Sequence, residues 1–378
     1  MRILHVAKVT GIAGAENHLL VLLPALRALG VDAEVVLLQE PGRPIAQLVR
    51  AFLAAGVPTY ELAINMDIDP WLVGRLARLV RSREPHGVHT HGVHADLYGR
   101  LSLRGLDHIL LLQSRHNDDR FRRLWVMRLL NQWLAERCAS IVAISDAVRE
   151  FVSIVEGIPP QKVQRIYYGL DAAPAPQNVA DLRAELGWTG APLVGFVGRL
   201  TGQKGVSVLL NAFANVLSAL PTARLLLIGD GPQRAKLEAL ARELQIATAV
   251  HFAGWRADAQ AQLATLNVIA IPSLWEGFGL VALEAMLAGV AVVASRVSAL
   301  PEIVLDGETG VLVPAANAAK LAATLLALLQ DPQHATQLGK NGRVRAAGLF
   351  TVNQMAAQHA ALYKSLAAPV TVVDRAGS

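Results

Sequence analysis

The sequence lacks several features that would assign it at once to a well-known class of protein. It has a single cysteine, Cys138, so no internal disulfide can form, and this usage suits a reducing compartment. No apolar run reaches the roughly 18 to 20 residues that a membrane-spanning helix needs. Neither the dinucleotide fingerprint GxGxxG nor a P-loop is present. We therefore expect a cytoplasmic protein, soluble or peripheral to a membrane, whose first residues form a strand and not a signal peptide.

Charged residues are also scarce, at 17%, whereas hydrophobic residues make up 53%. This balance indicates a well-packed α/β protein and excludes a disordered chain. The net charge of +5 favours anionic ligands or an anionic membrane face, but it is too small to indicate nucleic-acid binding. A chain of 378 residues is longer than a single hydrophobic core usually supports, so we expect two domains.

Short β-rich runs alternate with amphipathic stretches, which predicts parallel sheets with helices on both faces. The strands expected in the first half are 3–6, 34–38, 87–90, 109–113 and 141–144, and those in the second are 193–197, 225–228, 250–252, 268–271, 290–294 and 311–313. A Pro/Ala-rich stretch at 170–178 separates the two series. We expect a first domain over 1–170, a linker over 171–188, a second domain over 189–350, and a C-terminal helix and tail over 351–378, with the helix crossing back to the first domain. Two doubly wound domains that face each other would form a cleft at the carboxyl ends of their strands.

The most informative segment follows the strand expected at 268–271. It contains Glu276, Gly277, Phe278, Gly279 and Leu280, with Glu284 farther along an apolar stretch. The pattern predicts a strand, a tight loop and the N-terminus of a helix, where free N–H groups favour electronegative ligand atoms. Carboxylates at such a place accept hydrogen bonds, so they suit a ribose or a hexose. The alternative is a buried helix with two incidental acids.

Three other loops follow expected strands. Arg199 and Lys204 lie in a glycine-rich loop, where two cations can neutralise a diphosphate without a metal; the alternative is two solvated charges. Gly229 belongs to a loop of the kind that lines a base or a ribose. Gly14 lies in a small-residue loop that lets backbone N–H groups approach a phosphate, although a plain tight turn explains it equally well.

Two patterns raise the question of a metal site. Asp67 and Asp69 have the spacing seen in metal-dependent sugar transferases, but Asp69 before Pro70 is also a good helix N-cap, and we favour the cap. Histidines recur near one strand, with Asp96 as an additional candidate ligand, yet polar histidines at a strand mouth are ordinary. His116 follows another expected strand. The recurring histidines are His86, His89, His91 and His94.

The segment from Arg120 to Trp133 is basic and rich in aromatic residues. Interfacial helices combine arginines with Trp, Phe and Leu in this way, so the segment is a candidate for contact with an anionic membrane. A helix that packs inward against its own sheet would show a similar pattern. A second basic candidate consists of Arg75, Arg78, Arg81 and Arg83.

Taken together, these motifs resemble the retaining glycosyltransferases of family 4 (glycosyl transferases group 1) over nearly the whole chain. Glu276 and Glu284 resemble the E-x7-E signature of that family, and Gly14 its amino-terminal glycine loop. Tyr168 stands where the family usually has Asn. The other matching segments are 142–148, 168–171, 198–205, 229–232 and 301–310.

The resemblance implies the GT-B fold, with two facing Rossmann-like doubly wound domains, and a nucleoside diphosphate sugar as donor. By analogy, Glu284 would bind the ribose, while Glu276 and the backbone from Gly277 to Leu280 would hold the donor hexose. The diphosphate would be bound by Arg199 and Lys204, with Gly229 lining the donor site and Gly14 closing over the phosphate. His116 would lie near the transferred sugar. No metal, cofactor or protein nucleophile is implied.

We therefore expect a metal-independent, configuration-retaining transferase that acts in cell-envelope polysaccharide or lipopolysaccharide synthesis. The donor would be a UDP-sugar in preference to a GDP-sugar, and the acceptor a glycan or a lipid-linked molecule. The protein would be cytoplasmic, with peripheral contact to the inner face of the membrane. The alternatives are an epimerase of the same fold and a non-catalytic sugar-nucleotide-binding protein; a phosphorylase would need a far longer chain.

Overall fold

The computed structural model describes residues 1–9, 14–40, 42, 45–66, 69–118, 120–171 and 182–368. Of the features predicted from the sequence, the loop at 10–13, Asp67, the Pro/Ala-rich stretch at 172–178 and the tail at 369–378 lie outside these residues. The chain forms two compact units. Unit 1 comprises Met1–Ile144, Arg149–Gly169 and Val352–Ser378, and unit 2 comprises Ser145–Val148 and Leu170–Thr351.

Unit 1 contains a parallel sheet with strand order β3-β2-β1-β4-β5-β6-β7. Its central strands are buried, as expected for a sheet covered on both faces; β1, β2 and β5 are rich in Val, Ile and Leu, whereas β4 has the sequence GVHTH. Strands β3 and β7 were not predicted, because they lie at the two edges of the sheet and their partly exposed sequences TYELA and VQR have little apolar character. The strands are β1 (Arg2–Val9), β2 (Asp32–Gln39), β3 (Thr59–Ala63), β4 (Gly87–His91), β5 (Leu110–Arg115), β6 (Ser140–Ala143) and β7 (Val163–Arg165).

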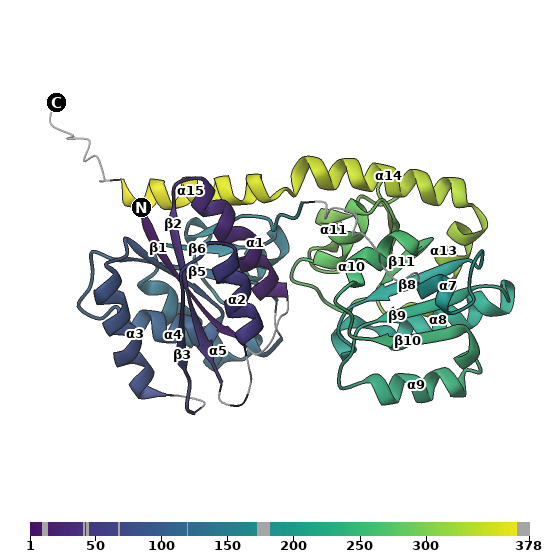
Figure 1. Cartoon of the computed structure of the whole chain (residues 1–378), viewed down its shortest axis with the longest axis horizontal. Coiled ribbons are helices and arrows are strands. Elements are labelled where there is room, and N and C mark those ends of the chain that lie inside the picture. The colour runs from purple at the N-terminus through teal and green to yellow at the C-terminus, as the bar shows by residue number, and fades with distance from the viewer. Residues whose placement is uncertain are drawn as a thin grey trace. The chain divides into compact units, whose positions relative to one another are not determined.

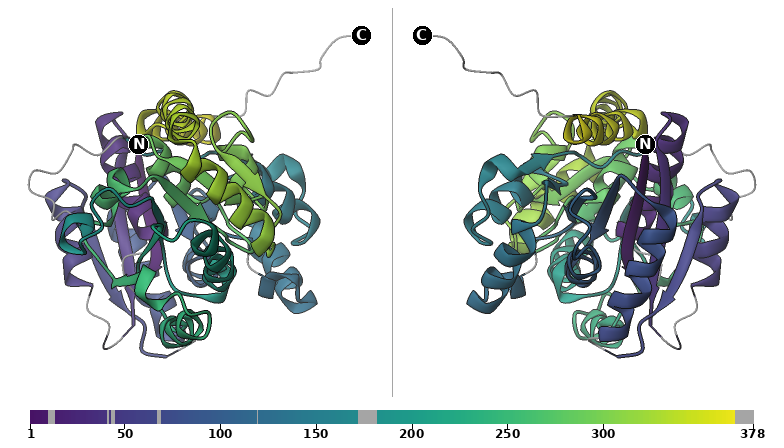
Figure 2. Two further views of the ribbon diagram at one scale, coloured as in Figure 1. Left: turned by 90° about the vertical axis from the view of Figure 1, so that its right-hand side faces the viewer. Right: turned by 90° about the vertical axis from the view of Figure 1, so that its left-hand side faces the viewer.

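The helices of unit 1 flank its sheet (Figure 2). The helix that ends the described chain, α15, packs against α1 within this unit (Figure 1). The helices are α1 (Gly14–Ala28), α2 (Ala46–Ala54), α3 (Pro70–Arg83), α4 (Val93–Ser102), α5 (Trp125–Glu136), α6 (Asp146–Ile154) and α15 (Val352–Ala367), with short 3₁₀ turns η1 (Arg120–Arg123) and η2 (Pro160–Lys162). The first residues of α6 cluster with unit 2.

Asp69 caps α3, as predicted. Its buried carboxylate accepts hydrogen bonds from the backbone N–H groups of Trp71 and Leu72 at 3.0 and 3.2 Å, and Pro70 occupies the first turn. The other carboxylate oxygen of Asp69 pairs with Arg75 at 2.7 Å. These contacts occupy the carboxylate, so Asp69 serves the helix and is not a metal ligand.

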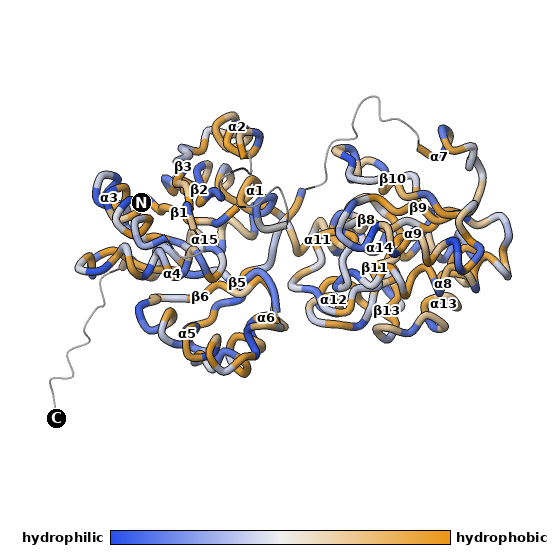
Figure 3. The backbone as a smooth tube through the Cα atoms, turned by 90° about the horizontal axis from the view of Figure 1, so that it is seen from below, coloured by the Kyte–Doolittle hydropathy of each residue, from blue (hydrophilic) through white to orange (hydrophobic). Residues whose placement is uncertain are grey.

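Unit 2 contains a second parallel sheet, with strand order β10-β9-β8-β11-β12-β13. The strands appear as predominantly hydrophobic segments of the tube in Figure 3. They are β8 (Leu193–Val197), β9 (Arg224–Ile228), β10 (Val250–Gly254), β11 (Val268–Ile271), β12 (Ala291–Ser295) and β13 (Val311–Val313). The helices are α7 (Leu182–Glu185), α8 (Val206–Ala219), α9 (Arg234–Glu243), α10 (Ala259–Gln262), α11 (Leu280–Leu287), α12 (Leu300–Ile303), α13 (Ala318–Gln330) and α14 (Pro332–Leu349), with 3₁₀ turns η3 (Gly202–Lys204), η4 (Ala247–Ala249) and η5 (Leu263–Thr265).

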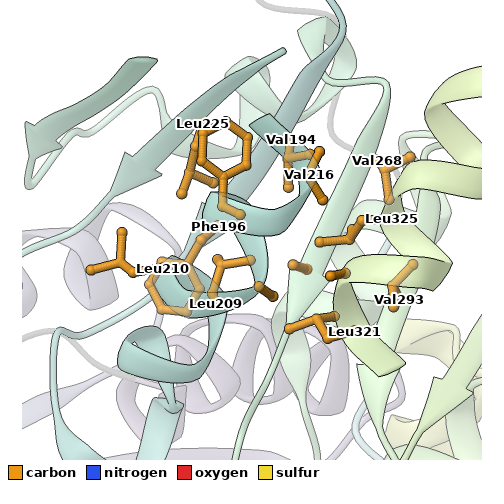
Figure 4. Packing of buried hydrophobic residues seen from close by; sticks show 14 of the residues in the cluster. Val194, Phe196, Leu209, Leu210, Val216, Leu225, Val268, Val293, Leu321 and Leu325 are labelled. Carbon is orange, nitrogen blue, oxygen red and sulfur yellow. The ribbon is translucent and has the colours of Figure 1, made fainter. Parts of the chain in front are cut away.

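The core of unit 2 lies between its sheet and the helices α8 and α13, which contact each other. Figure 4 shows Phe196 of β8 and Leu225 of β9 among the side chains of this core, together with Leu209 of α8 and Leu325 of α13. Burying each large apolar side chain stabilises the fold by about 1.5–3 kcal/mol. The core of unit 2 therefore stabilises the arrangement of the strands and the positions of the loops that follow them. Within the described residues, no helix is long and apolar enough to cross a membrane.

In both sheets, the sequence order of the strands reverses at one point. In unit 1 the order reverses between β1 and β4, and in unit 2 it reverses between β8 and β11. In open parallel sheets, ligands bind beyond the carboxyl ends of the strands at such a point, because the two connections leave in opposite directions there. The loops that follow β8 and β11 are therefore the first place to look for a site in unit 2.

Candidate active site

The loop after β8 carries Arg199 and Lys204, and the loop after β11 carries Glu276. Backbone contacts join the two loops. The N–H of Leu274 donates to the Gln203 carbonyl at 2.7 Å, and the Gln203 side chain donates to the Trp275 carbonyl at 3.1 Å. The switch point thus brings together two segments that are about seventy residues apart in the sequence.

A glycine makes this close approach possible. Gly205 has φ +63°, and a Cβ placed there would lie 2.0 Å from the backbone carbonyl oxygen of Pro272. A side chain at this position would therefore push the β8 loop away from the β11 loop. The glycine is required by both the positive φ and the missing space.

Lys204 and Glu276 form an ion pair across the two loops. The Lys204 ammonium lies 2.8 Å from each carboxylate oxygen of Glu276, and the two side chains are only 21% and 11% exposed. An ammonium has three N–H donors, so one remains when two bond to the carboxylate. Each oxygen of Glu276 likewise retains a lone pair for a hydroxyl group.

Glu284 lies one turn into α11, in the same motif as Glu276, but its surroundings are different. No ion pair or side-chain hydrogen bond of Glu284 is found among the described residues. Burial without a compensating charge raises the pKa of Glu284 to about 7, from an ordinary value of 4.5. A half-buried carboxyl group without a partner is costly for the fold when it ionises, and such groups cluster at functional sites.

The glycines around Glu276 leave the backbone open while the aromatic ring between them is buried. Gly279 caps α11 with φ +98°, and Phe278 packs edge-on against Phe350 with ring centroids 5.9 Å apart. Phe278 can therefore offer a ligand its backbone but not its ring. The backbone of Gly277 to Leu280 leads directly into the N-terminus of α11, where free N–H groups favour anions and hydroxyl oxygens.

Arg199 and Gly229 complete the group of predicted residues in unit 2. Arg199 is exposed and makes no ion pair within the described part of the chain, so its guanidinium is available. Gly229 follows β9 with φ +135°, and a Cβ there would lie 1.9 Å from the Gly198 carbonyl oxygen. Unit 2 thus holds two cations, two carboxyl groups and glycine-dependent loops at the carboxyl end of one sheet.

Both halves of the chain match known protein families. Residues 178–345 match the family described as Glycosyl transferases group 1, and residues 12–173 match Glycosyltransferase Family 4. The chain is 30% identical over 315 residues to the alpha-maltose-1-phosphate synthase of Mycolicibacterium smegmatis, covering 74% of this chain and 79% of that enzyme. It belongs to glycosyltransferase family 4.

Other relatives agree with this assignment. The MMP alpha-(1->4)-mannosyltransferase of Mycolicibacterium hassiacum is 32% identical over 278 residues, which are 70% of this chain and 65% of that enzyme. Among solved structures, HepE of Anabaena, in complex with UDP and glucose, superposes with a TM-score of 0.84 at 23% identity over 97% of this chain and all of that one. Sucrose-phosphate synthase from Thermosynechococcus elongatus gives 0.81 at 26% identity, over 97% and 99%. The predicted GT-B fold is confirmed.

The remaining predicted residues of this glycosyltransferase, Gly14 and His116, lie in unit 1. Gly14 begins α1. Both ring nitrogens of His116 are engaged: Nδ1 lies 2.5 Å from the Tyr168 hydroxyl and Nε2 lies 3.0 Å from His91. Burial and the nearby Arg115 lower the pKa of His116 to about 3, so the ring is neutral and cannot serve as a general acid near neutral pH.

The metal hypothesis based on Asp96 is wrong. The Asp96 carboxylate bonds to Thr90 and Arg115 at 2.5 and 2.6 Å, on the sheet face opposite to His89 and His91. Adjacent residues of a strand point to opposite faces, which separates Thr90 from its two histidine neighbours. Asp96 belongs to a buried ionic network with Arg115, Arg122 and Glu156.

Two other histidines of the recurring group also lie apart. His86 precedes β4, where its ring nitrogen accepts from the Arg2 backbone, and His94 is exposed on α4. In their place, the structure brings His5, His18 and His359 next to His89 and His91. His5 pairs in register with His89, a relation that requires the strand order to be known.

Proposed function

We propose that this glycosyltransferase transfers a sugar, with retention of anomeric configuration and without a metal, from a nucleoside diphosphate sugar to a glycan or lipid-linked acceptor. The ion pair between Lys204 and Glu276, held across the switch point of unit 2, carries the proposal. It places a cation and a hydroxyl-binding carboxylate within one hydrogen-bonded group, which suits the junction between a diphosphate and a hexose.

The chemistry follows from the charges of these loops. When the bond between the sugar and the diphosphate breaks, negative charge accumulates on the leaving phosphate. The third N–H donor of Lys204 and the available guanidinium of Arg199 stabilise that charge, which lowers the barrier without a metal ion. Glu276 accepts hydrogen bonds from the hexose hydroxyls and so fixes the orientation of the reacting carbon.

Glu284 binds the ribose. A ribose presents two adjacent hydroxyl donors, and an ionised carboxylate can accept both. Because the pKa of Glu284 is raised to about 7, the ligand-free side chain is partly neutral at neutral pH and ionises when the hydroxyls bind. We therefore expect donor affinity to rise as the pH increases through 7.

We favour a UDP-sugar as donor, since the structurally similar HepE is known in complex with UDP-glucose. We assign the transfer to cell-envelope polysaccharide or lipopolysaccharide synthesis, a role that fits relatives such as the phosphatidyl-myo-inositol mannosyltransferase of Mycobacterium leprae, which is 28% identical. The alternatives are an epimerase and a non-catalytic binding protein. A transferase releases UDP from a UDP-sugar only when an acceptor is added. This dependence distinguishes it from an epimerase and from a non-catalytic binding protein.

Calorimetric titration with UDP and GDP, followed by turnover of their sugars, tests the donor site. Lys204→Ala should weaken UDP binding about ten- to a hundredfold, because it removes a charge-assisted hydrogen bond of about 1.5–3 kcal/mol. Lys236→Ala, which changes an exposed lysine of α9 in the same unit, is the matched control and should leave binding unchanged. If the Lys204 and Lys236 variants bind UDP with equal affinity, the assignment of the donor site is wrong.

Two further measurements address the course of the reaction. Proton NMR of the product compares its anomeric configuration with that of the donor, and inversion would exclude the proposed mechanism. Turnover in EDTA should match turnover without it. A loss of activity that added Mg²⁺ restores would contradict the metal-free scheme.

We also propose that an exposed apolar surface on η1 and α5, here called the α5 patch, contacts an anionic membrane. Trp125 is 72% exposed and Leu129 is 56% exposed. The segment 120–135 has no acidic residue, and its arginines Arg123 and Arg128 are exposed, whereas Arg122 is buried against Glu156. Aromatic and aliphatic side chains beside arginines are typical of interfacial helices. The α5 patch consists of Phe121, Leu124, Trp125, Val126, Leu129 and Trp133.

Sedimentation with vesicles tests this contact. The double variant Trp125→Ala/Leu129→Ala should bind vesicles containing anionic lipid at least about tenfold more weakly than the unmodified chain. Trp255→Ala changes a tryptophan of unit 2 that is equally exposed, at 71%, and should have no effect. Equal loss in both variants, or equal binding to neutral vesicles, would contradict an anionic-membrane surface on α5.

A further inference from the structure

Buried histidines cover one face of the sheet in unit 1, beneath α1 and α15. Their side chains are at most 5% exposed where they lie on the strands and the two helices. None of them belongs to the loops of unit 2 that we assign to the donor. This histidine layer consists of His5 on β1, His18 on α1, His89 and His91 on β4, His116 after β5, and His359 on α15.

Strand register brings three of these side chains together. His5 lies directly beside His89 in the pairing of β1 with β4, and His91 follows two residues later on the same face. One ligand nitrogen from each of His5, His89 and His91 lies within 4.8 Å of the others. Nδ1 of His5 and Nε2 of His91 are already 3.0 Å apart.

In two of these rings, the nitrogen Nδ1 is hydrogen-bonded to a neighbouring side chain. Nδ1 of His91 bonds to His116 at 3.0 Å, and Nδ1 of His89 bonds to the Tyr363 hydroxyl at 2.7 Å. Hydrogen bonds of this kind orient the histidine ligands of metal sites. The Nε2 atom of His89 bonds to Ser114 at 2.8 Å, and it would exchange this partner for a metal.

A second observation points to a ligand in the same layer. Three buried ring nitrogens have no hydrogen-bond partner in the described structure: Nε2 of His5, Nδ1 of His18 and Nε2 of His359. Nδ1 of His359 faces the Met355 carbonyl, which can only accept, so this nitrogen carries the proton and Nε2 holds a lone pair. The ring of His359 is centred 6.0 Å from that of His89.

We propose that His5, His89 and His91 bind one transition-metal ion of the type that prefers imidazole nitrogen, such as Zn²⁺. With metal–nitrogen distances of about 2.0–2.1 Å, tetrahedral ligand nitrogens lie about 3.3 Å apart and their ring centroids about 5.2 Å apart. The three centroid separations here are 4.6, 5.1 and 5.3 Å, which match this spacing. The planes of His5 and His91 are inclined by 15° and those of His89 and His91 by 27°, so the rings must rotate for their nitrogens to converge on one ion. The Ser114 hydroxyl, which lies 2.8 Å from Nε2 of His89, is the candidate for the fourth ligand of a tetrahedral site.

The ion joins β1 to β4 at the switch point of unit 1 and takes no part in the chemistry of unit 2. The proposal is therefore independent of the proposed transfer reaction. Because the site is buried, a metal enters during folding and is not removed by brief exposure to EDTA. Metal-free chemistry at the donor and a metal in the histidine layer are compatible.

The test uses the full chain without a histidine tag, refolded with Co²⁺ and then dialysed. We expect about one equivalent of cobalt by elemental analysis, together with the intense visible absorption of four-coordinate Co²⁺. Competition with Zn²⁺ should abolish this absorption. His91→Gln should reduce the retained metal at least tenfold, whereas His94→Gln, which alters an exposed histidine three residues away, should leave it unchanged.

Several results would overturn the proposal. One is the absence of retained cobalt in the unmodified chain, and another is the weak absorption of six-coordinate Co²⁺, which indicates surface binding. A third is equal retention by the His91 and His94 variants. If His91→Gln fails to fold by circular dichroism, His5→Asn replaces it, and the measurements on the unmodified chain still decide. In each of these cases the histidine layer is held by hydrogen bonds alone.

Discussion

Replacing Glu284 by Gln should stabilise the fold and weaken donor binding at the same time. Glu284 is half-buried on α11 and has no charged partner among the described residues, and its pKa is raised from 4.5 to about 7. Between these two values, the folded chain binds more protons at this site than the unfolded chain does. The free energy of unfolding therefore falls as the pH rises through this window.

The size of the effect follows from the two pKa values. The interval from 4.5 to about 7 corresponds to about 3 kcal/mol, which is the cost of ionising Glu284 in the ligand-free protein. Glutamine is neutral at every pH and avoids that cost. Glu284→Gln should therefore exceed the unmodified chain in unfolding free energy by up to about 3 kcal/mol at about pH 8, and by little at about pH 4.5.

Chemical unfolding of the ligand-free full chain at these two pH values measures the difference. Glu243→Gln, at an exposed position of α9, is the matched control and should show no such pH dependence. UDP titration of the same proteins should show Glu284→Gln binding about ten- to a hundredfold more weakly at about pH 8, since an ionised ribose acceptor is lost. A variant that is no more stable at pH 8, or whose gain is the same at both pH values, would refute the reasoning.

Three further substitutions test other parts of the structure. Gly205→Ala should abolish UDP binding measured by calorimetry, because its Cβ would meet the Pro272 carbonyl; Gly289→Ala has a similar φ but open space and should retain binding. Asp69→Ala should lower the unfolding free energy by about 2 kcal/mol, through the lost α3 cap and the unpaired Arg75, and a loss below about 0.5 kcal/mol would contradict that role. Arg115→Leu should cost about 3–5 kcal/mol in the same measurement, because it leaves Asp96 buried without its cation and Glu156 with Arg122 alone. A neutral result would show that the network is dispensable.

The sequence was sufficient to predict most of the buried strands and the E-x7-E motif, because both are local patterns. An apolar run such as 268–271 forms a strand wherever it packs, and glycines beside Glu276 imply a tight turn. Strand β3 escaped prediction because an exposed edge strand does not need a continuous apolar run. The cap at Asp69 was predictable for the opposite reason: the side chain and its N–H partners lie within three residues.

The ion pair between Lys204 and Glu276 could not be predicted from local patterns. The sequence suggested a phosphate ligand in one loop and a sugar ligand in the other, and the structure brings the two side chains into contact. Their meeting depends on β8 and β11 being neighbours, which is a property of the strand order. The histidine layer depends in the same way on the pairing of β1 with β4.

The sequence by itself determined the α/β character of this glycosyltransferase, the positions of its loops and the types of charged residue that they carry. These properties follow from hydrophobic periodicity and turn chemistry, which act over a few residues. Only the tertiary structure decided which charges are paired, which carboxyl group is left without a partner, and which histidines share a face. Those outcomes depend on register and burial, and both are set by contacts between residues far apart in the chain.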